Sequence, residues 1–240
     1  MKSIKRFLVV IALLALTISL VACNIELGEN TDETNNENEQ VSYEITYTNL
    51  DIYEDSIGSI WVSIISEITN TGTTDLYLSS GSIDLENESK SLVKVLNLVS
   101  VYPQIISPGE KGYYYANTTV DNITVNSELT AIVHPDIKRS KINKISFPVT
   151  DVSISDREYG EIQAIGRVEN TSDKDESLLY VAVVLFDSDD KPIAVLSTIT
   201  DVKAGNKIGF SATALRLSDD LESSSVKRFV CYAYTFQFQI

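Results

Sequence analysis

The feature that most constrains the fold is an internal repeat, in which two stretches of the chain align at an offset of 100 residues. Both stretches alternate apolar with polar residues, which is the period of a β-strand with one buried face. Each ends in a similar turn, Asn70-Thr71-Gly72 in the first copy and Asn170-Thr171-Ser172 in the second. The aligned pairs are Ile45 and Ile145, Tyr47 and Phe147, Ile52 and Val152, Val62 and Ile162, Ile64 and Ala164, Ser66 and Gly166, and Ile68 and Val168.

A second turn and a further strand recur in the same order after the repeat. Pro108-Gly109-Glu110-Lys111 precedes an aromatic-rich strand at 113–120, and Ala204-Gly205-Asn206-Lys207 precedes a strand at 208–214. We interpret this recurrence as the duplication of one structural unit, because similarity at a fixed offset is typical of repeated units. Halves of about 100 residues with short strands and close turns are typical of antiparallel sandwiches.

The sequence therefore predicts an all-β fold, with two tandem immunoglobulin-like antiparallel β-sandwich domains at 42–136 and 145–240. Between them lies the segment 137–144, whose basic residues are Lys138, Arg139, Lys141 and Lys144. We favour a solvated linker for this segment. The alternatives are a site for an anionic ligand and a contact with an acidic neighbouring domain.

The first 22 residues have the pattern of a secretory leader. Basic residues at the start precede an apolar run of about 14 residues from Phe7 to Leu20. At the rise of a helix this run is shorter than the roughly 20 residues that cross a bilayer. It ends in Leu20-Val21-Ala22-Cys23, which resembles the lipobox of bacterial lipoproteins.

The resemblance implies that Cys23 receives a covalent diacylglyceryl group and becomes the first residue of the mature chain. Residues 1–22 are then a cleaved signal peptide, and 23–41 hold the lipidated cysteine and a disordered acidic tether. The segment Asn24–Gln40 contains too little apolar surface to fold. We expect the protein on the extracytoplasmic face of a cell membrane, the alternative being an ordinary secretory signal with an unmodified Cys23.

The net charge is −15, and removal of the three basic residues of the leader, which contains no acid, brings it to −18. We expect no binding to nucleic acid, because such binding depends on Lys and Arg that neutralise phosphates. The same charge disfavours peripheral adhesion to anionic lipid. The expected membrane partner is therefore lipid, through the covalent anchor at Cys23.

One strand of the second half is apolar on both faces. Its alternating residues are Val181, Val183 and Leu185 on one side, and Ala182, Val184 and Phe186 on the other. Such a strand is expected in the middle of a sheet whose two faces are both covered.

Within this strand, Val183-Val184-Leu185-Phe186-Asp187 follows the Asn-Thr turn and precedes a polar turn. The order is similar to that of the FxLYD-type domain, a family of small immunoglobulin-like modules common in bacterial surface lipoproteins. The third and fifth residues match the family pattern, Phe replaces its Tyr, and Val stands in place of its Phe. The resemblance covers roughly residues 152–214. It implies a fold and a surface location, and it brings no catalytic residues.

Residue types that carry catalysis are few. His134 is the single histidine, and Cys231 has no cysteine partner if Cys23 is lipidated. A reactive or metal-binding thiol needs a neighbouring His or a second Cys, so we expect Cys231 to be a packed strand residue. We expect His134 to lie in a solvated turn before Pro135. We expect no cofactor, because the sequence contains no Gly-rich phosphate loop, no HExxH and no CxxC.

Two groups of residues leave alternatives open. Asp187, Asp189 and Asp190 offer carboxylates that Ca²⁺ could use, but they lack the Gly and the distal Glu of an EF-hand loop, so a hairpin turn is expected. Other side chains could stack on sugars or peptides if they were exposed. These are Tyr113, Tyr114, Tyr115, Tyr102, Tyr53 and Trp61. Core filling is expected instead, because strand alternation buries about half of them.

The sequence therefore predicts a protein that is not an enzyme. It favours a membrane-anchored surface lipoprotein that acts as a binding or interaction module in the bacterial envelope. Its partner would be an envelope or extracellular protein or a glycan. The alternative is a solute receptor or an envelope enzyme with a cleft between the domains, which the basic segment and the tyrosines suggest.

Overall fold

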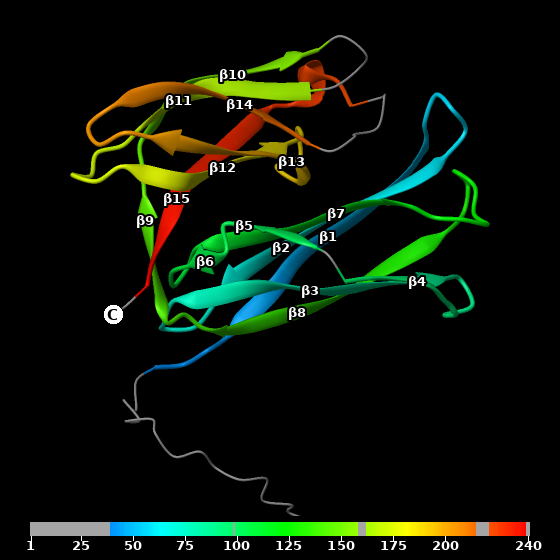
Figure 1. Ribbon diagram of the computed structural model, residues 1–240. Coiled ribbons are helices and arrows are strands. Elements are labelled where there is room, and N and C mark those ends of the chain that lie inside the picture. The colour runs from blue at the N-terminus through cyan, green and yellow to red at the C-terminus, as the bar shows by residue number, and fades with distance from the viewer. Residues whose placement is uncertain (1–38, 98, 158–161, 215–220, 239–240) are drawn as a thin grey trace, which may run out of the picture. The chain divides into compact units, whose positions relative to one another are not determined.

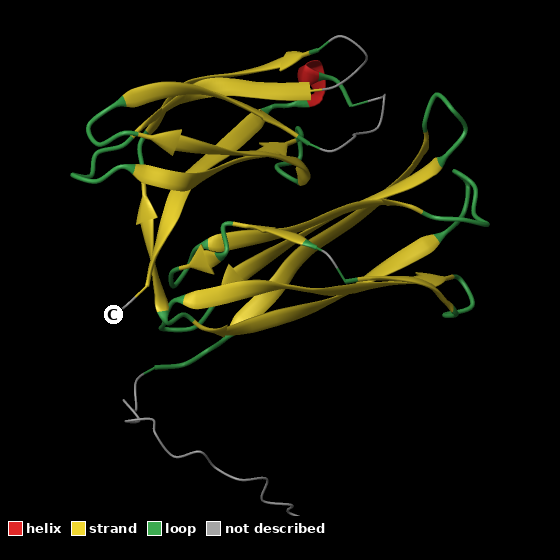
Figure 2. Cartoon of the chain, viewed as in Figure 1, coloured by secondary structure: helices red, strands yellow, loops and turns green. Residues whose placement is uncertain are grey.

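The computed structural model describes residues 39–97, 99–157, 162–214 and 221–238, and these are almost entirely β (Figures 1 and 2). Cys23, the predicted signal peptide and most of the predicted tether lie outside the described residues. All strand pairs within the described part are antiparallel. The predicted all-β fold is confirmed.

The first half forms two sheets, with strand orders β1-β2-β7-β5 and β4-β3-β6, and with β8 paired to β3. Its strands are β1 (Tyr43–Glu54), β2 (Ile60–Asn70), β3 (Leu76–Asn87), β4 (Leu92–Leu96), β5 (Ser100–Tyr102), β6 (Ile105–Ile106), β7 (Lys111–Thr119) and β8 (Leu129–Arg139). Inward-facing side chains of the two sheets form one buried cluster, which includes Ile64, Leu78, Leu85 and Tyr114. Alternation along each strand supplies this core, as the sequence predicts.

The second half forms one sheet of seven strands, in the order β10-β11-β14-β13-β12-β15-β9. Its elements are β9 (Ile142–Ser146), β10 (Val149–Asp156), β11 (Ile162–Glu169), β12 (Glu176–Phe186), β13 (Pro192–Val202), β14 (Lys207–Thr213), the 3-10 helix η1 (Ser223–Ser225) and β15 (Arg228–Phe238). A single residue pair, Ser197 and Thr213, joins β13 to β14. The sheet divides there into two layers around a second buried cluster.

The strand predicted to be apolar on both faces is β12, which lies between β13 and β15. Its residues Val181, Val183 and Leu185 belong to the core of the second half. The alternate residues Ala182, Val184 and Phe186 belong to a third cluster, which also contains Tyr113 and Tyr115 of the first half. Both faces are therefore covered, as expected for a central strand.

The two halves share a topology and a buried corner. The order β1-β2-β7 recurs as β10-β11-β14, and the pair of β3 with β8 recurs as β12 with β15. Asn70 Nδ2 donates to the carbonyls of Thr74 at 2.9 Å and Ile106 at 3.0 Å, and Asn170 donates to the two corresponding carbonyls at 2.7 and 2.9 Å. Each side-chain carbonyl also accepts a backbone N–H two residues further on, at 2.9 Å. The two turns therefore have the same pattern of hydrogen bonds.

The repeat diverges at its start. Ile45 lies in β1 and pairs with Ile68 of β2, whereas the aligned Ile145 lies in β9 and pairs with Thr235 of β15. The difference follows from Pro148, which has no N–H to continue a ladder. The residue before it, Phe147, donates to the carbonyl of Ala233 at 2.8 Å, and the chain then crosses to the opposite layer.

Most of the segment predicted as a solvated linker lies in strands instead. β8 continues to Arg139 and β9 begins at Ile142, so that only Ser140 and Lys141 lie between them. The cause is the apolar residues in and beside the basic segment: Ile137 packs against the core of the first half and Ile145 against that of the second. Clustered charge indicated a linker, but the burial of these isoleucines determines the local structure.

Candidate functional site

Three connections lie at one end of the first half, between β1 and β2, β3 and β4, and β7 and β8 (Figure 1). The last two border a hollow of about 630 Å³. A second hollow of about 460 Å³ adjoins it and extends along Leu50, Asp51 and Ile52 of β1. Residues that line both hollows are Glu88, Ser127, Glu128 and Leu129.

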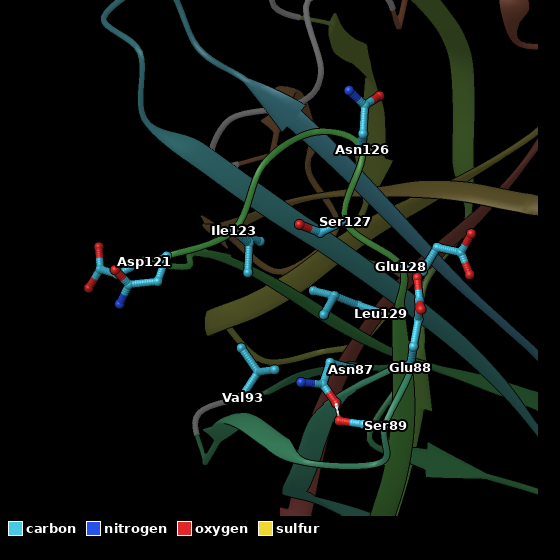
Figure 3. Close-up of a pocket in the computed structure, with 11 residues that line it drawn as sticks. Asn87, Glu88, Ser89, Val93, Asp121, Ile123, Asn126, Ser127, Glu128 and Leu129 are labelled. Carbon is cyan, nitrogen blue, oxygen red and sulfur yellow. Dashed lines mark hydrogen bonds between the residues drawn. The ribbon is translucent and has the colours of Figure 1, made fainter.

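The larger hollow has an apolar floor and an acidic rim. Val93, Ile123 and Leu129 pack against the core of the first half and gather in the middle of the hollow (Figure 3). Asp121 lies on one side of them, and Glu88 and Glu128 lie toward the other (Figure 3). No Lys, Arg or His is among the residues that line this hollow. Its chemistry suits a cationic group with an apolar portion.

Short-range hydrogen bonds fix the loops around the hollow. The Asn87 side-chain carbonyl accepts the Ser91 backbone N–H at 3.0 Å and the Ser89 hydroxyl at 2.8 Å. In the other loop, the Thr124 N–H donates to the Ser127 hydroxyl at 2.9 Å. Asn and Ser side chains commonly close such turns. None of these residues was singled out from the sequence, because a hollow depends on how two distant turns meet.

The connections that border the hollow lie at the opposite end of the sandwich from the point where the described chain enters it (Figure 1). The entering residues are held by Thr71 N–H to Ser42 O and by Thr73 N–H to Gln40 O, both 3.0 Å. β1 then runs for 12 residues toward the hollow. At the rise of an extended strand this separates the two ends by roughly 35 Å.

Cys231 is packed as the sequence predicts. It lies in β15, is only partly exposed, and packs against the core of the second half. Burial raises the pKa of its thiol to about 11. A thiol that resists ionisation is a poor nucleophile, so this side chain behaves as a small apolar residue.

The expectation of a solvated turn at His134 is wrong. His134 and Pro135 lie inside β8, and the His134 Nε2 atom is 3.1 Å from the Asp84 carboxylate. Among the described strands β8 pairs only with β3, and an edge strand tolerates a proline. The ladder is irregular opposite Pro135, where Gly81 has a φ of +55° and a Cβ would lie 2.5 Å from the His134 carbonyl oxygen.

The acidic run forms a hairpin turn, as predicted. The Asp187 Oδ1 atom accepts the backbone N–H groups of Asp189 and Lys191, both at 2.9 Å. Asp190 has a φ of +62° and its carboxylate accepts a hydrogen bond of 2.6 Å from Arg228. Within the described ranges, no three His, Cys, Asp or Glu side chains are grouped as a metal ion would require.

The tyrosine run fills the interior, as predicted. Tyr113, Tyr114 and Tyr115 are all buried. Tyr113 and Tyr115 belong to the cluster that contains residues of both halves, where the ring of Tyr113 meets the edge of Phe186 at 6.1 Å between centroids. In the same region the Ser197 hydroxyl donates to the Tyr102 hydroxyl at 3.1 Å. These tyrosines, which the sequence suggested as the lining of a cleft, therefore pack in the interior.

Three basic residues of 137–144 contact carboxylates of the protein itself, namely Lys138, Arg139 and Lys144. Lys144 Nζ lies 2.6 Å from the Glu110 carboxylate, and Arg139 lies 2.5 Å from that of Glu39. Burial disfavours the charge on Glu110, but the hydrogen bond from Lys144 and the Ser107 N–H outweigh it and lower the Glu110 pKa. Of the alternatives for the basic segment, a contact with an acidic neighbour agrees with these pairs.

No family model matches the chain, and no curated protein or solved structure matches it either. The resemblances to the lipobox and to the FxLYD-type domain therefore stay predictions. In the part of the chain that the structure describes, no helix has both the length and the apolar character needed to cross a bilayer.

Proposed function

We propose that this protein is a lipid-anchored, non-enzymatic binding module of the bacterial envelope, attached at Cys23 and presenting one end of its first β-sandwich to a partner. The observation that carries the anchor is the apolar run that ends in Leu20-Val21-Ala22-Cys23. The acidic composition of Asn24–Gln40 supports a spacer between lipid and domain. A flexible coil of this length reaches on the order of 20 Å.

The position of the hollow supports the binding role. It lies at the end of the first half that faces away from the entering segment at Gln40–Ser42. A partner would therefore reach it without displacing that attachment. Two side chains that could take part in catalysis have structural roles instead, which supports a binding role. Cys231 packs against the core of the second half, and the Asp187 carboxylate accepts two backbone N–H groups.

The anchor is tested by intact mass spectrometry of the protein recovered from membranes of its native host. We expect a chain that begins at Cys23 and carries a diacylglyceryl group. A Cys23→Ser variant should leave the membrane fraction, whereas the matched control Cys231→Ser should remain there. An unmodified wild-type chain, cut at another residue, would overturn the proposal.

The binding site is tested by charge reversal at the hollow. A short peptide with Lys and Leu residues should bind the wild-type protein, and binding should weaken about tenfold in the double variant Asp121→Lys with Glu128→Lys. The control is Asp173→Lys in an exposed turn of the second half. Equal binding by both variants would show that the hollow is not the site.

A further inference from the structure

β8 and β15, the last strands of the two halves, have corresponding positions in their sheets but differ at their outer edges. Ile83 pairs with Val133 of β8, and the aligned Val183 pairs with Cys231 of β15. The outer edge of β15 pairs with β9, from Tyr234 to Phe238. β8 pairs with β3 alone among the described strands, so none of them is hydrogen-bonded to the corresponding edge, residues 136–140, although β1 comes close to β8 without pairing.

The uncovered edge adjoins exposed apolar surface. Tyr43 and Ile45 at the start of β1 are 40% and 39% exposed. β1 and β8 lie close together, and the ion pair between Arg139 and Glu39 brings the residues just before β1 to the end of β8. In the second half the residue aligned with Ile45 is Ile145, and it packs against the core from β9.

The backbone of residues 136–140 is competent to pair. Pro135 lies just before this stretch, in which residues bonded to β3 alternate with residues whose N–H and C=O point to the outer edge, while the Ser140 N–H donates to the Asp75 carbonyl at 2.8 Å. Strand edges are common sites for the addition of an extended peptide, whose main chain supplies affinity and whose alternate side chains supply specificity. The pairing of β9 with Tyr234–Phe238 shows that the same edge of this fold accepts a strand of five residues.

The charge of the edge indicates the kind of strand that fits. Lys138 and Arg139 have side chains that are 62% and 50% exposed, in a chain whose net charge is −15. Arg139 contacts the carboxylate of Glu39, and Lys138 lies 3.7 Å from the carboxylate of Asp136. Exposed ion pairs are weak, so the acidic side chains of an added strand would compete with Asp136 for Lys138. Apolar side chains at alternate positions would cover Tyr43 and Ile45.

We infer that the outer edge of β8 at residues 136–140 accepts an extended segment of a partner protein as an added antiparallel strand, with alternating apolar and acidic side chains. This surface is distinct from the acidic hollow. The inference deepens the proposed binding role, and it depends neither on the anchor at Cys23 nor on the cationic ligand of the hollow.

The probe is the synthetic peptide acetyl-Thr-Ile-Glu-Ile-Glu-Val-Thr-amide, added to the full-length protein in detergent. Hydrogen exchange followed by mass spectrometry should show slower exchange over 136–140 when the peptide is present. The same peptide with its Glu residues replaced by Lys should bind about tenfold more weakly. A version with N-methyl groups along one edge should not bind, because it cannot donate to β8.

Variants locate the site. Lys138→Glu should weaken binding of the acidic peptide about tenfold, and Lys203→Glu, at an exposed lysine of the second half, should not change it. If Lys138→Glu were to unfold the protein, the exchange of Glu for Lys in the peptide tests the same charge contact on the wild type. Protection outside 136–140, protection present without peptide, self-association through this edge, or equal binding of the N-methylated peptide would each overturn the inference.

Discussion

The two halves share a topology and a hydrogen-bonded corner, but they differ at the outer edge of the last strand, β8 in the first half and β15 in the second. In the second half the chain crosses between layers at Phe147 and Pro148, so that β9 covers the edge of β15. In the first half β1 stays with β2 throughout, apart from an irregularity between Ile45 and Tyr47, and none of the described strands pairs with the outer edge of β8. A duplicated fold can thus keep one copy closed and leave the other with a surface for a partner.

The shared corner should matter most to stability. Replacing Asn70 or Asn170 by Ala removes a buried side chain that satisfies two carbonyls and one N–H. Each replacement should lower the free energy of unfolding by about 3 kcal/mol, measured by urea denaturation. The exposed Asn126→Ala serves as a control. If only one of the two variants were destabilised, the corners would not be equivalent.

The closed and open edges differ at Ile145 and Ile45, which align in the repeat. Ile145→Asp puts a charge against the core of the second half and should cost about 2 kcal/mol of unfolding free energy. Ile45→Asp falls on a residue that is 39% exposed and should cost less than about 0.5 kcal/mol. Similar losses in the two variants, measured under the same denaturant conditions, would contradict the difference between the edges.

The Lys144 contact with Glu110 should give a small pH dependence. Because the folded-state pKa of Glu110 is lowered from 4.5, its contribution to stability is present above about pH 4.5 and is lost as the pH falls through the lowered value. Its exposure keeps the effect below about 1 kcal/mol. Thermal unfolding of Lys144→Met between pH 3 and 7 should lack this part of the wild-type slope, and an unchanged slope would contradict it.

Cys231 corresponds to Val133 in the first half, as the strand registers show. With a pKa of about 11, its thiolate population at pH 8 should be about a hundredfold below that of an ordinary thiol. Alkylation of the native protein should therefore be slow and that of the unfolded protein fast, as followed by intact mass. Cys231→Val should change stability by less than about 1 kcal/mol. Rapid labelling in the native state would contradict a packed thiol.

Much of the fold could be predicted from local patterns. The alternation in β2 and β11 indicated strands with one buried face, and the two apolar faces of β12 indicated a central strand. The turns at Asn70 and Asn170 were recognised as equivalent, although their hydrogen bonds to residues 36 and 32 positions away could not be predicted from the sequence. His134 was misplaced because a proline was taken for a turn, and the fact that β8 is an edge strand is not a local property.

The sequence by itself determined most of the strands, the repeat and many of the residues that fill the two cores, because these follow from apolar periodicity within short stretches. Only the tertiary structure decided which edge is covered, where the hollow forms and which carboxylates meet the basic residues of 137–144. These depend on contacts between distant strands, such as β9 with β15 and Arg139 with Glu39. The energy of such contacts depends on register and layer, which no single stretch of sequence specifies.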